Sequence, residues 1–191
     1  MEIKNFGEYG IYLTGSSNNN ISGNKITNNG HGIRLVYSSG NSVNGNNIAD
    51  NWIGIEGFQS PQNSIVGNTL TRNFDGIELD GSSSYSIVGN NITANNGTGI
   101  FLYWSWSNTI LENNITANGY CGIWASRSSS SIIYHNNFVN NDVILVEDET
   151  GYSNVWDDGY PSGGNHWSNW WWQGVDEKNG LNQDKPGSDG V

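Results

Sequence analysis

The chain has 191 residues, of which only 35% are hydrophobic, and its formal net charge is −11. This charge argues against nucleic-acid partners, which need clustered Lys and Arg, and against an anionic membrane surface. No apolar stretch reaches the ~18 residues of a membrane span, and the single Cys121 excludes an internal disulfide. Nine Trp, nine Tyr and a regular series of Ile argue against disorder.

Three apolar columns recur along the chain at a constant step of 22 or 23, which is the signature of a repeat protein. The first column consists of Ile11, Ile33, Ile55, Ile77, Ile100 and Ile123. The second column consists of Ile21, Val43, Ile65, Ile87, Ile110 and Ile132. The third column consists of Ile26, Ile48, Leu70, Ile92, Ile115 and Phe138. The segments are rich in β-branched residues and lack a 3.6-residue stripe, so the pattern predicts strands and not helices.

Each repeat is interpreted as one coil of three short strands. Gly32-Ile33-Arg34-Leu35 illustrates the first strand, in which Ile33 and Leu35 face inward by strand alternation. A Gly-Asn pair such as Gly45-Asn46 marks a corner, because Gly adopts left-handed backbone angles and the Asn amide bonds turn backbone. Amides stacked once per coil predict hydrogen-bonded ladders along the rod. A second Asn column consists of Asn29, Asn51, Asn73, Asn95, Asn118 and Asn141.

We therefore predict an all-β fold: a right-handed, single-stranded parallel β-helix of about six 22–23-residue coils over residues 1–150. Residues 151–191 are expected to form a C-terminal Trp-rich cap and an acidic tail, because the last apolar coil of a solenoid needs a cover. The chain begins partway through a coil at Ile3, so we expect end-to-end stacking there or a larger parent chain. The aromatic residues expected in the cap are Trp156, Tyr160, Trp167, Trp170, Trp171 and Trp172.

The repeat unit N-x-I-x-G-N-x-I-x-x-N…G-I-x-L, over residues 10–141, resembles the NosD-like repeats of the pectin-lyase-like β-helix superfamily. The stretch NVWDDGYPSGGNHWSNW, residues 154–170, is similar to the sequence that closes such repeats. The resemblance implies a parallel β-helix, an extracellular or cell-surface location and association with carbohydrate. It leaves the activity open, because this fold hosts lyases, hydrolases, epimerases and inert spacers.

The outward residues of the first strand form the face on which we expect function. Contiguous exposed aromatic side chains are uncommon without a partner, and their flat rings suit stacking on sugars. The predicted partner is therefore a polysaccharide or surface glycan. The candidate carbohydrate-binding residues are Trp52, Phe58, Phe101, Tyr103 and Trp124.

The middle of this face is acidic, and Glu56, Glu78 and Asp80 are the candidate catalytic residues. Glu56 and Glu78 stand one coil apart, so a separation of ~4.8 Å is expected, which suits the two carboxyl groups of a retaining glycosidase. The plainer interpretation is a solvated face on which Arg34 pairs with Glu56 and no chemistry occurs. The candidate bases for a lyase or epimerase, Arg34 and Arg72, match no motif.

Calcium is the one cofactor that the sequence suggests, because oxygen-rich sites hold it. A mobile acidic tail without metal explains the C-terminal acids equally well. Copper sites need clustered His, Cys or Met, and only His135 and His166 are expected to approach each other. The candidate calcium ligands are Asp75, Glu78, Asp80, Asp184 and Asp189.

Three functions compete. The leading hypothesis is a module that binds polysaccharide or builds a surface structure without turnover. The alternative is a polysaccharide lyase, glycoside hydrolase or epimerase acting on the Glu56–Asp80 face, and a lesser one, implied by the NosD name, is a copper-enzyme maturation factor. Sequons at Asn91 and Asn114 are candidate glycosylation sites in an exported protein. An interrupted outward Thr column, which would suit ice binding, consists of Thr27, Thr71, Thr93 and Thr116.

Overall fold

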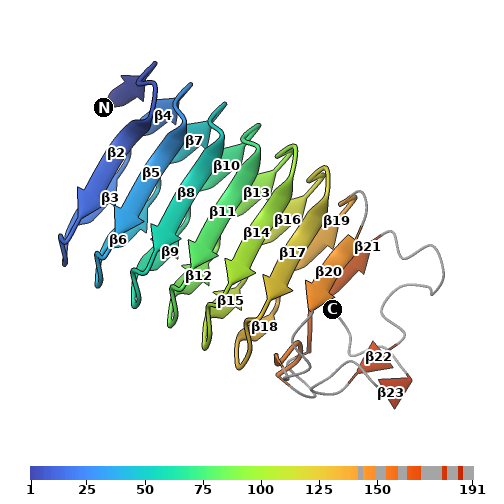
Figure 1. Ribbon diagram of the computed structural model, residues 1–191. Helices are drawn as coiled ribbons and strands as arrows, with labels where there is room; N and C mark the ends of the chain where they lie inside the picture. Colours follow the sequence, from blue (N-terminus) through green and yellow to red (C-terminus); the bar gives the residue numbers. More distant parts are fainter. Residues whose placement is uncertain (142–143, 149–153, 159–162, 169–177, 180–184, 187–191) are drawn as a thin grey trace.

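The computed structural model describes residues 1–141, 144–148, 154–158, 163–168, 178–179 and 185–186. Its strands wind into a parallel β-solenoid in which each coil adds one strand to each of three sheets (Figure 1). The predicted all-β fold and its coil length are confirmed, since Ile77 pairs in parallel with Ile55 of the preceding coil and with Ile100 of the next. The proposed division at residue 150 stays a prediction.

Sheet A runs along one side of the rod and contains short strands of three residues. Its strands, in order, are β1 (Glu2–Lys4), β4 (Lys25–Thr27), β7 (Asn47–Ala49), β10 (Thr69–Thr71), β13 (Asn91–Thr93), β16 (Asn114–Thr116), β19 (Asn137–Val139) and β21 (His166–Ser168).

Sheet B contains the longest strands and carries the face on which function is expected. Its strands, in order, are β2 (Tyr9–Thr14), β5 (His31–Val36), β8 (Ile53–Phe58), β11 (Asp75–Asp80), β14 (Thr98–Tyr103), β17 (Cys121–Ser126) and β20 (Ile144–Asp148).

Sheet C closes the coil. Its strands, in order, are β3 (Asn20–Ser22), β6 (Ser42–Asn44), β9 (Ser64–Val66), β12 (Ser86–Val88), β15 (Thr109–Leu111) and β18 (Ile132–Tyr134). A separate antiparallel pair consists of β22 (Lys178–Asn179) and β23 (Lys185–Pro186).

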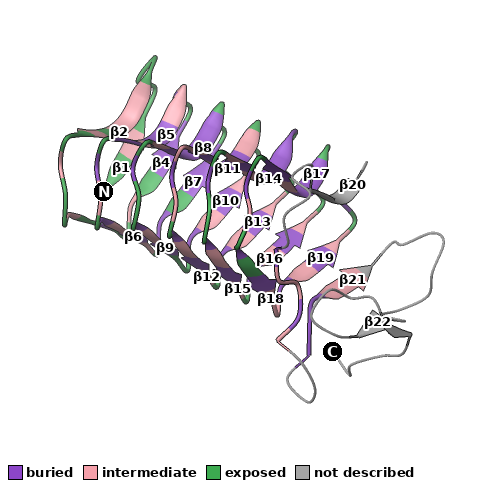
Figure 2. Cartoon of the chain, turned by 60° about the horizontal axis from the view of Figure 1, so that its bottom comes forward, coloured by how far each residue is buried: buried purple, intermediate pink, exposed green. Residues whose placement is uncertain are grey.

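The apolar columns predicted from the sequence line the interior of the rod, and Figure 2 shows the buried positions recurring along each sheet. One member of the second column was wrong. Ile110 pairs with Ile133, and Ile133 is fully buried while Ile132 is 40% exposed. The coils from Ile77 onward are one residue longer than those before it, so the inward residue of β18 lies one position later than the prediction placed it.

Buried amides join each coil to the next. The amide of Asn46 donates to Asn68 Oδ1 at 3.0 Å, and the amide of Asn68 donates in turn to Asn90 Oδ1 at 3.0 Å. The Asn68 amide also donates to the Val43 carbonyl at 2.9 Å, so it closes the backbone of the preceding coil. The column from Asn29 to Asn141 repeats the pattern. Each amide thus satisfies buried turn groups that water cannot reach.

A third ladder was not predicted from the sequence, because Tyr85 interrupts its series of Asn residues. It begins with Asn19, Asn41 and Asn63, continues at Asn108, and has Tyr85 in place of an amide. Beside it runs a ladder of serine hydroxyls, in which the backbone N–H of Ser60 donates to Ser82 Oγ at 2.9 Å. The turn from sheet B to sheet C is therefore also stabilised by side-chain hydrogen bonds between successive coils.

The corner glycines adopt the left-handed backbone that the sequence pattern requires. Gly45 has a φ of 60°, and the residues at the same corner of later coils, Glu112 and His135, both have a φ of 56°. This conformation costs a side-chain-bearing residue about 1 kcal/mol or more. The hydrogen bonds of the ladder amide next to the corner hold the backbone in this conformation despite the cost.

Two tryptophans of the expected cap lie among the described residues. Trp167 stacks on Phe138 with ring centroids 4.5 Å apart, and Trp156 lies 6.1 Å from Trp167. Both pack against the core where the last coil ends. The other expected cap residues, Tyr160, Trp170, Trp171 and Trp172, lie outside the described residues, so the cap as a whole stays a prediction.

One coil departs from the repeat in a compensated way. The inward position that carries Leu35 and Leu79 in neighbouring coils carries Gly57 in β8. A Cβ at Gly57 would collide with the hydroxyl of Tyr85, which is 1% exposed and accepts a hydrogen bond from the Asn63 amide at 2.9 Å. The Tyr85 side chain therefore fills the volume that a leucine would take.

This compensation predicts strong coupling between positions 57 and 85. Gly57→Leu alone should cost about 1–3 kcal/mol through overpacking, and Tyr85→Asn alone about 2–5 kcal/mol through the cavity it leaves. The double variant restores the residues of the other coils, so its urea-unfolding free energy should exceed the additive expectation by at least ~1 kcal/mol. Strictly additive losses would contradict the compensation.

Candidate functional site

The outward side chains of sheet B stand in two rows that follow the predicted register. In the first row the residues paired from coil to coil are Arg34, Glu56, Glu78, Phe101 and Trp124. In the second row they are Val36, Phe58, Asp80, Tyr103 and Ser126. The structure therefore brings the predicted acidic and aromatic residues together on one face.

Glu56 is the most enclosed member of this face, with 6% of its surface exposed. Its Oε2 lies 2.9 Å from Arg34 Nε and 3.1 Å from His31 Nε2. Arg34 Nη1 also donates to the Tyr9 hydroxyl at 3.1 Å. The predicted Arg34–Glu56 pair is confirmed, but it is not solvated, and the sequence analysis did not foresee that His31 and Tyr9 complete it. The Glu56 carboxylate is therefore engaged by two basic side chains of the same face.

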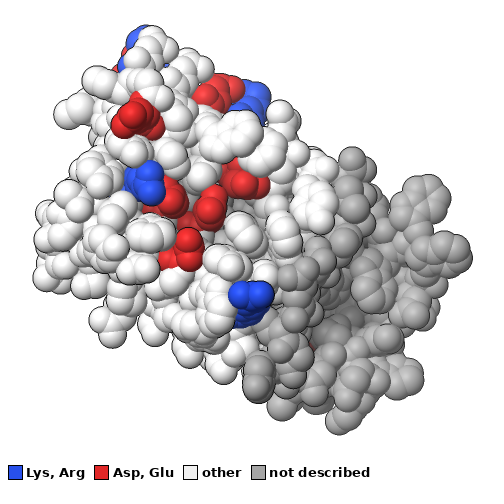
Figure 3. Space-filling model, viewed as in Figure 1, with Lys and Arg blue, Asp and Glu red and all other residues white. Residues whose placement is uncertain are grey.

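In the described part of the chain, the neighbouring carboxylates lack a basic side chain at ion-pair distance. Among the described residues no ion pair reaches Asp75, Glu78 or Asp80, which gather beside Glu56 over β8 and β11 (Figure 3). Burial, together with the charges of Glu56, Asp75 and Asp80, raises the pKa of Glu78 to about 7. Burial also raises the pKa values of Asp75 and Asp80. Glu78 is therefore poised to exchange a proton near neutral pH.

Aromatic rings border the carboxylates along the rod. Phe101 stacks on Trp124 with centroids 4.7 Å apart, and Phe101 lies 6.3 Å from Tyr103. On the turn that enters sheet B, Trp52 stacks on Phe74 at 4.2 Å, with 59% of Trp52 exposed. Sequence reasoning listed Trp52 but did not pair it with Phe74, since their contact depends on two turns lying side by side.

Metal ligation finds no geometric support here. Within the part of the chain that the structure describes, no three His, Cys, Asp or Glu side chains converge as a metal site requires. Of the calcium candidates, Asp75 instead accepts a hydrogen bond from the Thr98 backbone at 2.6 Å. Asp184 and Asp189 lie outside the described residues. The calcium site stays a prediction.

The two candidate glycosylation sites, Asn91 and Asn114, lie in an outer amide row on sheet A. The Asn114 amide donates to Asn91 Oδ1 at 2.9 Å, and the Asn137 amide donates to Asn114 Oδ1 at 2.7 Å. A glycan on Asn114 Nδ2 would leave one N–H on that atom to donate to Asn91 Oδ1. Glycosylation of either residue stays a prediction.

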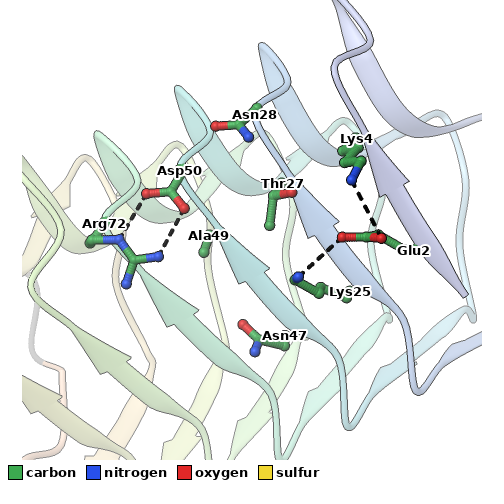
Figure 4. Close-up of a pocket in the computed structure, with 9 residues that line it drawn as sticks. All are labelled: Glu2, Lys4, Lys25, Thr27, Asn28, Asn47, Ala49, Asp50 and Arg72. Carbon is green, nitrogen blue, oxygen red and sulfur yellow. Dashed lines mark hydrogen bonds and ion pairs between the residues drawn. The ribbon is translucent and has the colours of Figure 1, made fainter.

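Sheet A also carries a charged hollow near the first coils (Figure 4). Its charged groups neutralise one another: Lys25 Nζ lies 3.0 Å from Glu2 Oε1, and Arg72 binds Asp50 through two hydrogen bonds of 2.8 Å. These are exposed pairs of small energetic value. No helix among the described residues is long and apolar enough to cross a membrane.

Comparison with known proteins places the chain among β-helix proteins. The family model described as periplasmic copper-binding protein (NosD) matches residues 5–170. No curated protein matches the chain.

Three solved structures illustrate the shared fold. A double mutant of the periplasmic alginate epimerase AlgG is 19% identical over 78% of this chain and 44% of its own, with a TM-score of 0.60. The alginate lyase from Paenibacillus sp. str. FPU-7 is 17% identical over 76% and 60%, with a TM-score of 0.63. The enzymatically active domain of bacteriophage CBA120 tailspike protein 2 is 18% identical over 100% and 32%, with a TM-score of 0.67. The chain spans less than two thirds of each, and identities this low show the fold alone.

The raised pKa of Glu78 makes stability depend on pH. The folded protein holds this proton up to about pH 7, whereas an unfolded glutamate loses it near pH ~4.3. Folding therefore takes up a proton at Glu78 between these pH values. The contribution of Glu78 to the free energy of unfolding is most favourable below pH ~4.3 and falls as the pH rises toward 7. In Glu78→Gln, the free energy of unfolding in urea should fall by less over this range than in the parent protein. At pH 8 the two losses should differ by on the order of 1–3 kcal/mol. Parallel curves for the two proteins would contradict the assignment.

Proposed function

Because the chain belongs to the NosD family, described as periplasmic copper-binding proteins, we propose that it is an exported β-helix module that binds polysaccharide along sheet B. Its location would be the extracellular side of the cytoplasmic membrane, at the cell surface or beyond. The single observation that carries this proposal is the row of aromatic rings in register on one face, from Phe101 to Trp124.

The arrangement of side chains on this face supports a long, flat ligand. The rings and carboxylates lie on consecutive coils, so a polymer lying along the rod would meet one pair of outward side chains at each coil. Trp52 and Phe74 add exposed aromatic surface on the neighbouring turn. Aromatic side chains bury much apolar area at little cost in conformational freedom, which suits binding of the apolar faces of sugars.

Oligosaccharide binding tests the proposal. Phe101→Ala and Trp124→Ala should each weaken binding of the best ligand from a glycan array by about tenfold, as expected for removing a buried aromatic contact. Tyr134→Ala removes an outward aromatic residue from sheet C and serves as the matched control. Isothermal titration calorimetry measures the affinities. Equal affinity in all four proteins, or no glycan bound at all, would refute the proposal.

A second candidate function is favoured by the protonation state of Glu78. A carboxyl group whose pKa lies at about 7 is suited to general acid or base catalysis. It stands in register with Glu56, whose carboxylate contacts Arg34 and His31. A polysaccharide lyase, glycoside hydrolase or epimerase would use Glu78 to move a proton while the aromatic rings position the chain.

Turnover decides between binding and catalysis. If the protein cleaves or epimerises a polymer that it binds, Glu78→Gln should lower kcat by roughly 10²-fold or more, because the amide exchanges no proton. Its affinity for the polymer should change far less. Asp50→Asn, on sheet A, is the control. Unchanged kcat in Glu78→Gln would remove Glu78 from any catalytic role, and no turnover in the parent protein would leave binding as the function.

Copper does not fit the described residues. The Cys121 thiol donates to the Ile123 carbonyl at 2.8 Å, and His31 is occupied by Glu56. His166 Nδ1 lies 2.7 Å from Asn137 Oδ1, and His135 Nε2 lies 3.5 Å from Asp158. His135 and His166 lie on neighbouring coils, as expected from the sequence, but no three His, Cys, Asp or Glu side chains converge among the described residues. The clustered soft or imidazole ligands that copper needs are therefore not found in this part of the chain. A role in copper-enzyme maturation therefore draws no support from this part of the chain.

A further inference from the structure

The acidic and aromatic parts of sheet B adjoin at a single boundary. Glu78 pairs in register with Phe101, and Asp80 pairs with Tyr103. The backbone of each acidic residue therefore lies one strand spacing, ~4.8 Å, from the backbone of an aromatic residue. On the other side of Phe101 its ring is covered by Trp124, with centroids 4.7 Å apart. The coil of Glu78 thus lies on the opposite side of Phe101 from the coil of Trp124.

Negative charge at this boundary is only partly offset: His31 lowers the pKa of Glu78, but burial and the charges of Glu56 and Asp75 outweigh its effect. Arg34 and His31 lie on the far side of Glu56 and contact that carboxylate. Arg127, the next cation along the rod, lies over the ring of Trp104 at 5.2 Å. Asp75, Glu78 and Asp80 have no ion pair among the described residues, and Glu56 adds to the repulsion at Glu78. Carboxylates gathered in this way favour a cation that joins them.

The rings favour the same kind of ligand. The face of an aromatic ring carries the negative part of its quadrupole and attracts a cation. A compact ammonium group held between carboxylates and a ring face gains from both. A carboxylate on the ligand would instead meet like charge, which disfavours binding.

We propose that the boundary formed by Asp75, Glu78, Asp80, Phe101 and Tyr103 selects polysaccharides that carry free amino groups, as in de-N-acetylated amino sugars. The proposal rests on the proposed function, that sheet B binds polysaccharide, and specifies the ligand class. The sugar rings pack on the aromatic residues while the ammonium groups lie at the carboxylates. Acetylation removes the positive charge, and a uronate reverses it.

Three oligosaccharides of equal length test this selectivity in calorimetry with the full chain: oligomers of glucosamine, of N-acetylglucosamine and of galacturonate. The glucosamine oligomer should bind at least about tenfold more tightly than the other two. Raising the salt concentration should weaken only its binding, because salt screens exposed charge pairs. Phe101→Leu should weaken binding of the glucosamine oligomer while keeping an apolar side chain at the site.

Amide variants separate the site from the overall negative charge. Glu78→Gln combined with Asp80→Asn should abolish the preference for the glucosamine oligomer. Glu8→Gln combined with Glu112→Gln also removes two carboxyl groups, from exposed positions outside sheet B, and should keep the preference. Thermal unfolding of both double variants verifies that they fold. Loss of selectivity in the control pair as well would overturn the proposal, because the preference would then reflect net charge.

The outcomes also separate the proposal from the function on which it rests. Binding of the N-acetylated or galacturonate oligomer as tight as that of the glucosamine oligomer, weakened by Trp124→Ala, would overturn the selectivity and leave polysaccharide binding intact. Absence of binding to any oligosaccharide would overturn both. A penta-lysine peptide that binds more tightly than the glucosamine oligomer would overturn the proposal in favour of a basic protein partner.

Discussion

Buried amides that repeat once per coil hold this molecule together. The link from Asn68 Nδ2 to Asn90 Oδ1 at 3.0 Å, and its equivalents along the rod, satisfy turn backbone inside the solenoid and keep neighbouring coils in register. A shift of one residue would turn every inward side chain outward. The same register that stacks the amides therefore places Glu56 beside Glu78 and Phe101 beside Trp124, so the ladder also builds the candidate binding face.

The face of sheet B divides into parts with different chemistry. Glu56 contacts Arg34 and His31, whereas Glu78 has no ion pair among the described residues, and burial together with the neighbouring acids raises its pKa to about 7. Two carboxyl groups one coil apart thus have different surroundings, because among the described residues only Glu56 has ion-pair partners within reach. Beside them the aromatic residues present apolar surface to a ligand. The combination suits binding of a polar polymer, and it places a proton-exchanging group where that polymer would lie.

Membership of the NosD family describes the architecture of the chain better than its chemistry. The family model covers residues 5–170, which include the repeated coils, yet the described His and Cys residues are spread along the rod and engaged by neighbours. The three solved structures with the same fold are larger, and their identities to this chain are 19%, 17% and 18%. A solenoid keeps its interior constant while its outward residues vary, so function has to be argued from the outward residues.

The coil length, the inward columns and two amide ladders were determined by the sequence alone, because a solenoid makes each contact between positions one period apart. The order of residues along sheet B was predictable for the same reason. The 22- or 23-residue period does not determine which side chains from different turns meet, and the tertiary structure decided these contacts. It brought His31 and Tyr9 to the Arg34–Glu56 pair, buried Glu56, and let Tyr85 fill the space above Gly57. It also placed Ile133, not Ile132, in the core. These outcomes depend on side-chain size and on which turns lie side by side, and both are settled only when the coils pack.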